Sequence, residues 1–247
     1  MVPPGGLKIG NEQIRRVEGV RFLGVWVDEG ITWNGHIDKL RSKVGQLLGI
    51  IGRSSSAIGK DSLLKLYNAL VLPHLQYCLM AWGDFRGNHN TNQGASLLKL
   101  QKKLLGVILG KTGRYHADPL FADLQILKID DLYRQQLRIH AWKFWNGKLP
   151  SSQARALSKI SETHEHKTRA AEKGMTIRTL DQKAMAYRVP KEWGALEGEL
   201  RDQKSLANFK KKSRGNFLQE YRDFKCETRG CFVCGRDTNG SSRNAEN

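Results

Sequence analysis

The sequence has few acidic residues, few cysteines and no long hydrophobic run. Its 24 Asp and Glu residues are outnumbered by 41 Lys and Arg, so the formal net charge is +17 at pH 7. This excess favours a polyanionic partner, with nucleic acid ahead of an anionic membrane or an acidic protein. A basic surface that only keeps the protein soluble is the plainer alternative. The apolar runs are far shorter than the ~20 residues that cross a bilayer, so no membrane-spanning segment is predicted.

The four cysteines and the first residues bear on the compartment. Three of the cysteines crowd near the end of the chain, which is unlike the disulfide framework of a small secreted protein. Residues 1–6 lack the charged and apolar regions of a signal peptide. We therefore expect an intracellular protein, nuclear or cytoplasmic. A chain of 247 residues can bury a core in one or two domains.

The acidic residues are distributed unevenly. None occurs between Phe85 and Ala117, and residues 85–160 hold 13 Lys and Arg against 4 Asp and Glu. The middle of the chain is therefore predicted to present the polyanion-binding face.

The beginning of the chain reads as a β-hairpin or short meander. Residues 7–9 and 20–27 are rich in apolar side chains, and Gly10-Asn11 between them is a turn signal. Residues 28–30, Asp-Glu-Gly, break the second strand.

Apolar residues spaced three and four apart then predict a series of helices. The helices are expected at residues 33–51, 60–72, 97–109, 130–145 and 206–221. Thr32 is a candidate N-cap for the first of them. Residues 75–82 are expected to continue the second helix beyond Pro73, with Cys78 in the core.

The predicted fold class is mainly α with a small N-terminal β-hairpin (α+β). We divide the chain into a hairpin at 1–30, a helical domain at 31–161, a loosely packed basic region at 162–225 with a helix near 205–221, and a cysteine-containing tail at 226–247. The tail is expected to be disordered because it is rich in Ser, Asn and Gly.

Lysines on the predicted helices are the candidate phosphate contacts. They lie beside or opposite the apolar stripes, and a solvated helix flank is the open alternative for each group. The candidates are Lys39, Lys43, Lys99, Lys102, Lys103, Lys210, Lys211 and Lys212.

Several possible catalytic or ligand motifs do not fit their chemistry. Gly110-Lys111-Thr112 resembles the end of a phosphate-binding loop, but Gly106 is one residue too close and lies in a helical pattern. We interpret the glycines as a helix end. Asp130-Asp131 is better explained as a helix cap than as a two-metal site. With no nucleophile and base in a supporting context, the chain alone is not expected to be an enzyme.

A cysteine cluster near the end is the candidate metal site. Cys226, Cys231 and Cys234 lie within nine residues, and three thiolates could hold most of a tetrahedral zinc ion. The fourth ligand would come from His164, His166, a partner chain or water. Cysteines without a metal are the alternative.

An ordered series of motifs runs along most of the chain. It comprises Phe22-Leu23-Gly24-Val25, Trp33-x-x-His36-Ile37, Leu66 to Cys78 with Trp82-Gly83, Leu100 to Lys103, Asp118 to Phe121 with Leu132-Tyr133, Thr168-Arg169, Tyr187 to Trp193, and Ser205 to Lys210. The series resembles the reverse transcriptases of non-LTR (LINE-type, jockey-like) retrotransposons. Val189 and Gly194 depart from the family pattern, in which Gly and Asn are expected. The Tyr-x-Asp-Asp polymerase motif does not occur in the sequence.

The resemblance implies a role for each part of the chain. Phe22, Leu23 and Gly24 would belong to the primer grip at the palm edge, and residues 31–161 to a thumb or connector that follows the template–primer duplex. The chain would then be the C-terminal portion of an RNA-directed DNA polymerase, inactive alone, with Mg²⁺ expected only in the missing catalytic palm. It would bind RNA, DNA or an RNA–DNA hybrid through backbone phosphates.

Its partner within the element would be the upstream polymerase and endonuclease portion. Three alternatives stay open: an active enzyme whose palm is encoded upstream, a host-domesticated binding module, and a zinc-dependent scaffold with no nucleic-acid role.

Overall fold

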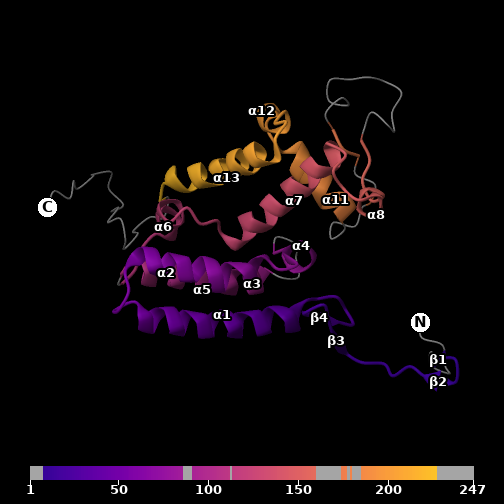
Figure 1. Cartoon of the computed structure of the whole chain (residues 1–247), viewed down its shortest axis with the longest axis horizontal. Helices are drawn as coiled ribbons and strands as arrows, with labels where there is room; N and C mark the ends of the chain where they lie inside the picture. The colour runs from indigo at the N-terminus through magenta and orange to yellow at the C-terminus, as the bar shows by residue number, and fades with distance from the viewer. Residues whose placement is uncertain are drawn as a thin grey trace.

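The computed structural model describes residues 8–85, 91–111, 113–159, 174–176, 179 and 185–226. The described chain is mostly helical, with two small β-hairpins before the first helix (Figure 1). The mainly α fold with an N-terminal hairpin is therefore confirmed. No described helix is both long enough and apolar enough to cross a membrane.

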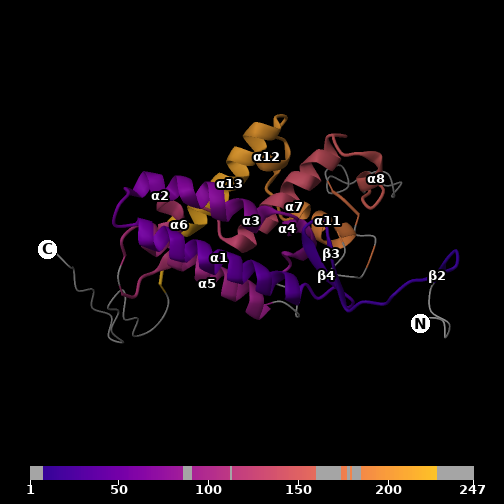
Figure 2. The same cartoon turned by 60° about the horizontal axis from the view of Figure 1, so that its bottom comes forward.

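The strands form two hairpins where the sequence predicted one. In the first, β1 (Lys8–Ile9) pairs with β2 (Glu12–Gln13) across Gly10-Asn11. In the second, β3 (Gly19–Phe22) pairs with β4 (Val25–Asp28). The apolar run at residues 20–27 is thus not one strand, because the chain reverses at Leu23-Gly24 in its middle. β1–β2 stands apart from the helical body in both views (Figures 1 and 2).

The first helix, α1 (Asn34–Ser54), follows the predicted stripe. Its buried residues are Ile37, Leu40, Val44, Leu47 and Ile51. Its start is built differently from the prediction, because the N-cap residue is Trp33, in the left-handed conformation at φ 63°. Thr32 contributes a long hydrogen bond, with the amide of Asn34 donating to its hydroxyl at 3.4 Å.

A chain of short helical segments leads back along α1. It comprises α2 (Lys60–Leu66), the π-helix η1 (Tyr67–Val71), α3 (Leu72–Gln76) and α4 (Leu79–Trp82). The continuous helix predicted over residues 75–82 is wrong, and so is the core position of Cys78. Cys78 is exposed and left-handed at φ 50°. The break turns Trp82 into the core, where its indole N–H donates to the carbonyl of Tyr77 at 2.8 Å.

In the view of Figure 1 the helices form three layers, with α1 in the lower layer and α2 and α3 in the central one. The helices that complete the central layer and begin the upper one are α5 (Thr91–Ile108), α6 (Ala117–Asp123) and α7 (Ile129–Trp145). Gly110 follows α5 at φ 61°, and the amide of Lys111 donates to the carbonyl of Gly106 at 2.8 Å. This arrangement is the glycine helix end that the sequence predicted.

Asp130 and Asp131 do not cap α7 as predicted, because the helix begins at Ile129, with Lys128 as the N-cap residue. Both aspartates lie inside its first turn, and Asp131 is buried. Its carboxylate accepts a short hydrogen bond from the Tyr221 hydroxyl. A contact with a residue 90 positions away, invisible in the local sequence, therefore fixes this side chain.

The upper layer is completed by segments from the second half of the chain. They are α8 (Ser151–Ala154), α11 (Met185–Gly194), α12 (Gly198–Arg201) and α13 (Leu206–Arg222). Trp193, Phe209 and Phe217 are fully buried, and α11 and α13 pack on α7. One hydrophobic cluster includes these side chains and those of α1, so it continues across the predicted domain boundary at 161–162.

Candidate nucleic-acid interface

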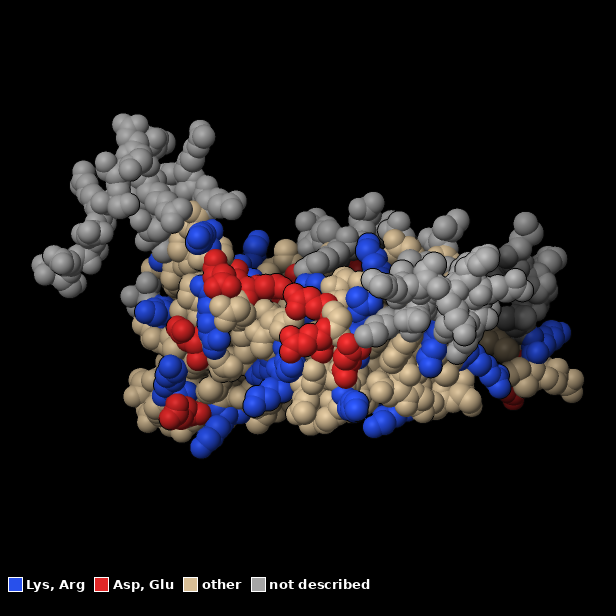
Figure 3. Space-filling view, turned by 90° about the horizontal axis from the view of Figure 1, so that it is seen from above, with Lys and Arg blue, Asp and Glu red and all other residues tan. Residues whose placement is uncertain are grey.

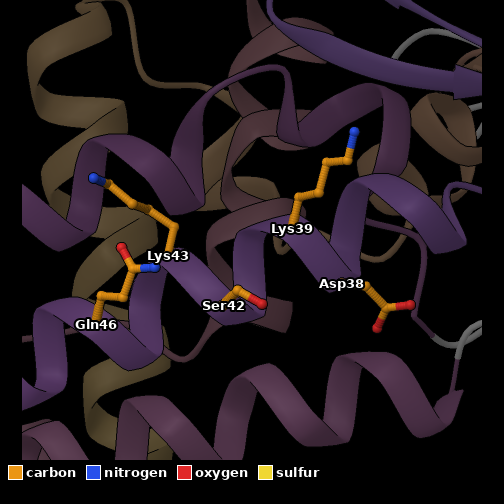
Figure 4. A pocket seen from close by; sticks show the side chains of 5 residues that line it. All are labelled: Asp38, Lys39, Ser42, Lys43 and Gln46. Atoms are coloured by element: carbon orange, nitrogen blue, oxygen red, sulfur yellow. The ribbon is translucent and has the colours of Figure 1, made fainter.

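The outer face of α1 carries an open depression of about 410 Å³. Its lining residues are Asp38, Lys39, Ser42, Lys43 and Gln46. All five belong to one helix, and the side chains of Lys39 and Lys43 leave its upper side in the view of Figure 4 and diverge, whereas Asp38 extends away from both. The depression is therefore lined by two lysines that are one helical turn apart along α1, with a hydroxyl and an amide beside them.

A second row of lysines lies on α5, the neighbour of α1 (Figure 2). Lys99 and Lys103 are exposed and Lys102 is half-buried. The two helices run in the same direction, and the side-chain amide of Gln93 in the first turn of α5 donates to the side-chain carbonyl of Asn34 in α1 at 2.6 Å. Lys39 lies five residues after Asn34, and Lys99 lies six residues after Gln93. The two lysine rows therefore lie at similar positions along the axes of the two parallel helices.

The two helices carry almost no negative charge. Among their residues are seven Lys and Arg and one acidic residue, Asp38. Arg41 neutralises that carboxylate in an exposed ion pair at 2.9 Å. The lysines of α1 and α5 therefore keep a local excess of positive charge.

The lysines of α13 lie in a different electrostatic setting. Lys210, Lys211 and Lys212 are all exposed, but Lys212 forms an ion pair with Glu199 at 2.7 Å. On the face that carries α12 and α13, acidic side chains alternate with basic ones (Figure 3). A phosphate approaching this face meets charges of both signs, so α13 is the weaker candidate of the two surfaces.

The predicted primer-grip residues form the tip of the β3–β4 hairpin. The side chains of Phe22 and Leu23 are 64% and 73% exposed. Leu23 and Gly24 both have positive φ, 45° and 83°, as a two-residue hairpin turn of type I′ requires. This conformation is strained for Leu. Tyr77 supports it by donating its hydroxyl to the Leu23 carbonyl at 2.6 Å.

The junction between the hairpin and α1 depends on the carboxylate of Asp28, for which the sequence predicted only a strand end. The carboxylate of Asp28 accepts hydrogen bonds from the amides of Thr32 and Trp33, at 2.9 and 2.8 Å. Partial burial raises the pKa of Asp28, but the hydrogen bonds from Thr32 and Trp33 outweigh it, and the net pKa lies below its ordinary value. The anionic carboxylate therefore holds the turn that leads into α1.

His36 and Trp26 complete this junction. The amide of Trp26 donates to Nδ1 of His36 in a long hydrogen bond of 3.5 Å, and the His36 ring meets Trp82 edge-on. Burial lowers the pKa of His36, and the nearby Lys39 ammonium lowers it further. The neutral imidazole is thus the form that fits the junction. Gly19 and Gly35 are the sequence features that could have indicated this junction, because the absence of a side chain at both positions leaves room for the Trp26 ring.

The predicted zinc site lies almost wholly outside the described chain. Cys226 is buried at its last position, whereas Cys231, Cys234, His164 and His166 fall beyond the described residues. Within the described ranges, no three His, Cys, Asp or Glu side chains come together as metal ligands. The zinc site stays a prediction.

Comparison with known proteins points in the same direction as the motif series. The chain is 24% identical over 134 residues to the RNA-directed DNA polymerase from mobile element jockey of Drosophila funebris. The similarity supports a distant relation to a retrotransposon reverse transcriptase. It covers 53% of this chain and 14% of that polymerase, so the chain matches only a small part of its relative. No protein-family model and no solved structure matches the sequence.

Proposed function

We propose that this chain is the part of a retrotransposon reverse transcriptase that follows the polymerase active site and binds the template–primer duplex. The lysine rows on α1 and α5 contact backbone phosphates, and the β3–β4 tip with Phe22 and Leu23 contributes the primer grip. Catalysis and Mg²⁺ binding belong to a separate palm, since Tyr-x-Asp-Asp does not occur in this sequence. The upstream polymerase and endonuclease portion of the element is the natural protein partner.

The arrangement of the lysines carries this proposal. Lys39 and Lys43 on α1, and Lys99 and Lys103 on α5, are pairs spaced four residues apart on parallel neighbouring helices. Four residues of helix span about 6 Å, close to the phosphate spacing along one nucleic-acid strand. Lysines in such a row bind phosphates as point charges, which gives affinity without sequence specificity.

The salt dependence of binding tests the proposal. Titration of the full chain with an RNA–DNA hybrid should show that log Kd changes linearly with the logarithm of salt concentration, with a slope of about 0.9 for each phosphate contact. The double variant Lys39→Gln/Lys43→Gln should reduce the slope by about 2.

A second double variant provides a control of equal charge. Lys210→Gln/Lys211→Gln removes the same two charges from the mixed-sign face of α13, and it should change the slope by less than half as much. Equal losses from the two variants would show that only net charge matters and would refute a specific interface. A wild-type affinity that ignores salt would refute phosphate binding altogether.

A further inference from the structure

The indole ring of Trp26 occupies a seat made by two glycines. A Cβ atom at Gly19 would come within 2.8 Å of the indole Nε1, and one at Gly35 within 2.9 Å of Cδ1. Gly19 lies in the paired strand β3 and Gly35 in the first turn of α1. The ring is therefore fixed between the hairpin and the helix. Any residue larger than glycine at position 19 or 35 would enter the space that the ring occupies.

The ring and Lys39 meet at the edge of the proposed interface. The Nζ atom of Lys39 lies 3.4 Å from the centroid of the Trp26 ring, close enough for a cation–π interaction. Lys39 remains exposed and lines the α1 depression together with Lys43 (Figure 4). Since an ammonium group has three N–H donors, the ring can hold one side of it while the others face outward.

We infer that Trp26 is a positioning residue that holds Lys39 ready to bind a nucleic-acid phosphate; this inference rests on the proposed function. A lysine side chain that is free in solution loses rotamer freedom when it binds. Lys39 has lost part of this freedom already, because the fixed ring restrains its ammonium. Lys43 lies one turn, about 6 Å, further along α1 and supplies the matched comparison in the same depression.

The first test uses the protein without nucleic acid. With ¹³C-labelled lysine, the ε-methylene protons of Lys39 should show an upfield ring-current shift, and Lys39→Gln assigns the signal. Trp26→Leu should abolish the shift, and Trp26→Phe should keep part of it. A Lys39 signal at the position of an unstructured lysine would overturn the inference whether or not the protein binds nucleic acid.

The second test is a pair of double-mutant cycles measured by binding to a short RNA–DNA hybrid duplex. Trp26→Leu should weaken binding about three- to tenfold, the effect expected when one long side chain must be immobilised. The slope against salt should not change, because no charge is lost. In the Lys39→Gln background the same substitution should have almost no effect. In the Lys43→Gln background its full effect should remain.

The outcomes separate the inference from the proposed function. If Trp26→Leu lowers the affinity equally in the Lys39→Gln and Lys43→Gln backgrounds, Trp26 has only a structural role. This result would overturn the inference and leave the proposed phosphate binding intact. Tighter binding by Trp26→Leu would show that the ring competes with phosphate, which also overturns it. If the wild-type chain does not bind the hybrid, the proposed function fails and the inference fails with it. Trp26→Phe should restore part of the affinity, which guards against a loss caused by misfolding.

Discussion

Single residues at the junction of hairpin and helix connect the fold to the proposed interface. Asp28 holds the turn into α1 as an anion, and His36 lies in the junction as a neutral ring. Both groups have a pKa below their ordinary value, but on acidification they become protonated in different pH ranges. The histidine responds first, because its ordinary pKa is 6.5 and that of Asp28 is 3.8.

Stability should therefore fall when the pH is lowered from 7 to 5. The unfolded chain protonates His36 below pH 6.5, whereas the folded chain resists protonation, so the unfolded state binds more protons in this range. Protonation also removes the Nδ1 acceptor for the Trp26 amide. Urea unfolding at several pH values measures the effect, and His36→Gln should flatten the pH dependence. His140, whose pKa is lowered by burial and then by Lys143, accounts for the remainder.

A histidine outside the core controls for general effects of acid. His74 is exposed, and His74→Gln should change the free energy of unfolding by less than about 0.5 kcal/mol. If His36→Gln behaved like His74→Gln, the junction would not be pH-sensitive.

At the scale of the elements, helical periodicity was the most reliable signal in the sequence. The stripe of α1 and the glycine end of α5 are confirmed, since both depend on interactions within a few residues of chain. The Leu23-Gly24 turn and the break at Cys78 were not predicted. Leu and Cys rarely adopt a left-handed backbone, so neither residue signals such a turn in the sequence. At Leu23 the supporting hydrogen bond comes from the Tyr77 hydroxyl, 54 positions away.

Two glycines of α1 should respond oppositely to alanine. A Cβ atom at Gly45 meets nothing within 4 Å, so Gly45→Ala should stabilise the protein by about 0.5–1 kcal/mol through helix propensity. At Gly35 the Cβ atom would press on the Trp26 ring at 2.9 Å, so Gly35→Ala should destabilise it by about 1 kcal/mol or more. Thermal unfolding compares the two directly. Stabilisation by both substitutions would mean that the Trp26 seat is looser than described.

At the scale of the whole molecule, the three layers share one core. Glu192 of α11 pairs with Arg134 and Arg138 of α7 at 2.6 and 3.2 Å. The two guanidinium groups lie over the buried ring of Phe217 in α13. The described part of the predicted loose region is thus joined to the helical domain by partly buried charge pairs as well as by apolar packing.

Unfolding should accordingly be a single cooperative transition. Phe217→Ala should lower the free energy of unfolding by about 3–5 kcal/mol, because it removes a fully buried ring. Far-UV circular dichroism and tryptophan fluorescence should give coincident denaturant curves for the wild type and the variant. Phe224→Ala, at a 38% exposed position, should cost less than about 1 kcal/mol. Separate transitions for the two probes would support the predicted boundary at 161–162.

The sequence by itself determined the long helices α1, α5, α7 and α13, the excess of positive charge and the lysine candidates, because periodicity and charge are local properties. Only the tertiary structure decided which of these lysines lie in a region of excess positive charge and which lie beside acidic side chains. It packed α1, which carries Lys39 and Lys43, along α5 and set Lys212 against Glu199. It also brought Trp26 to Lys39 and Tyr77 to Leu23. These contacts join residues that are 13 or more positions apart, several of them across turns whose geometry the sequence does not reveal. They therefore form only when the elements that carry the residues pack together.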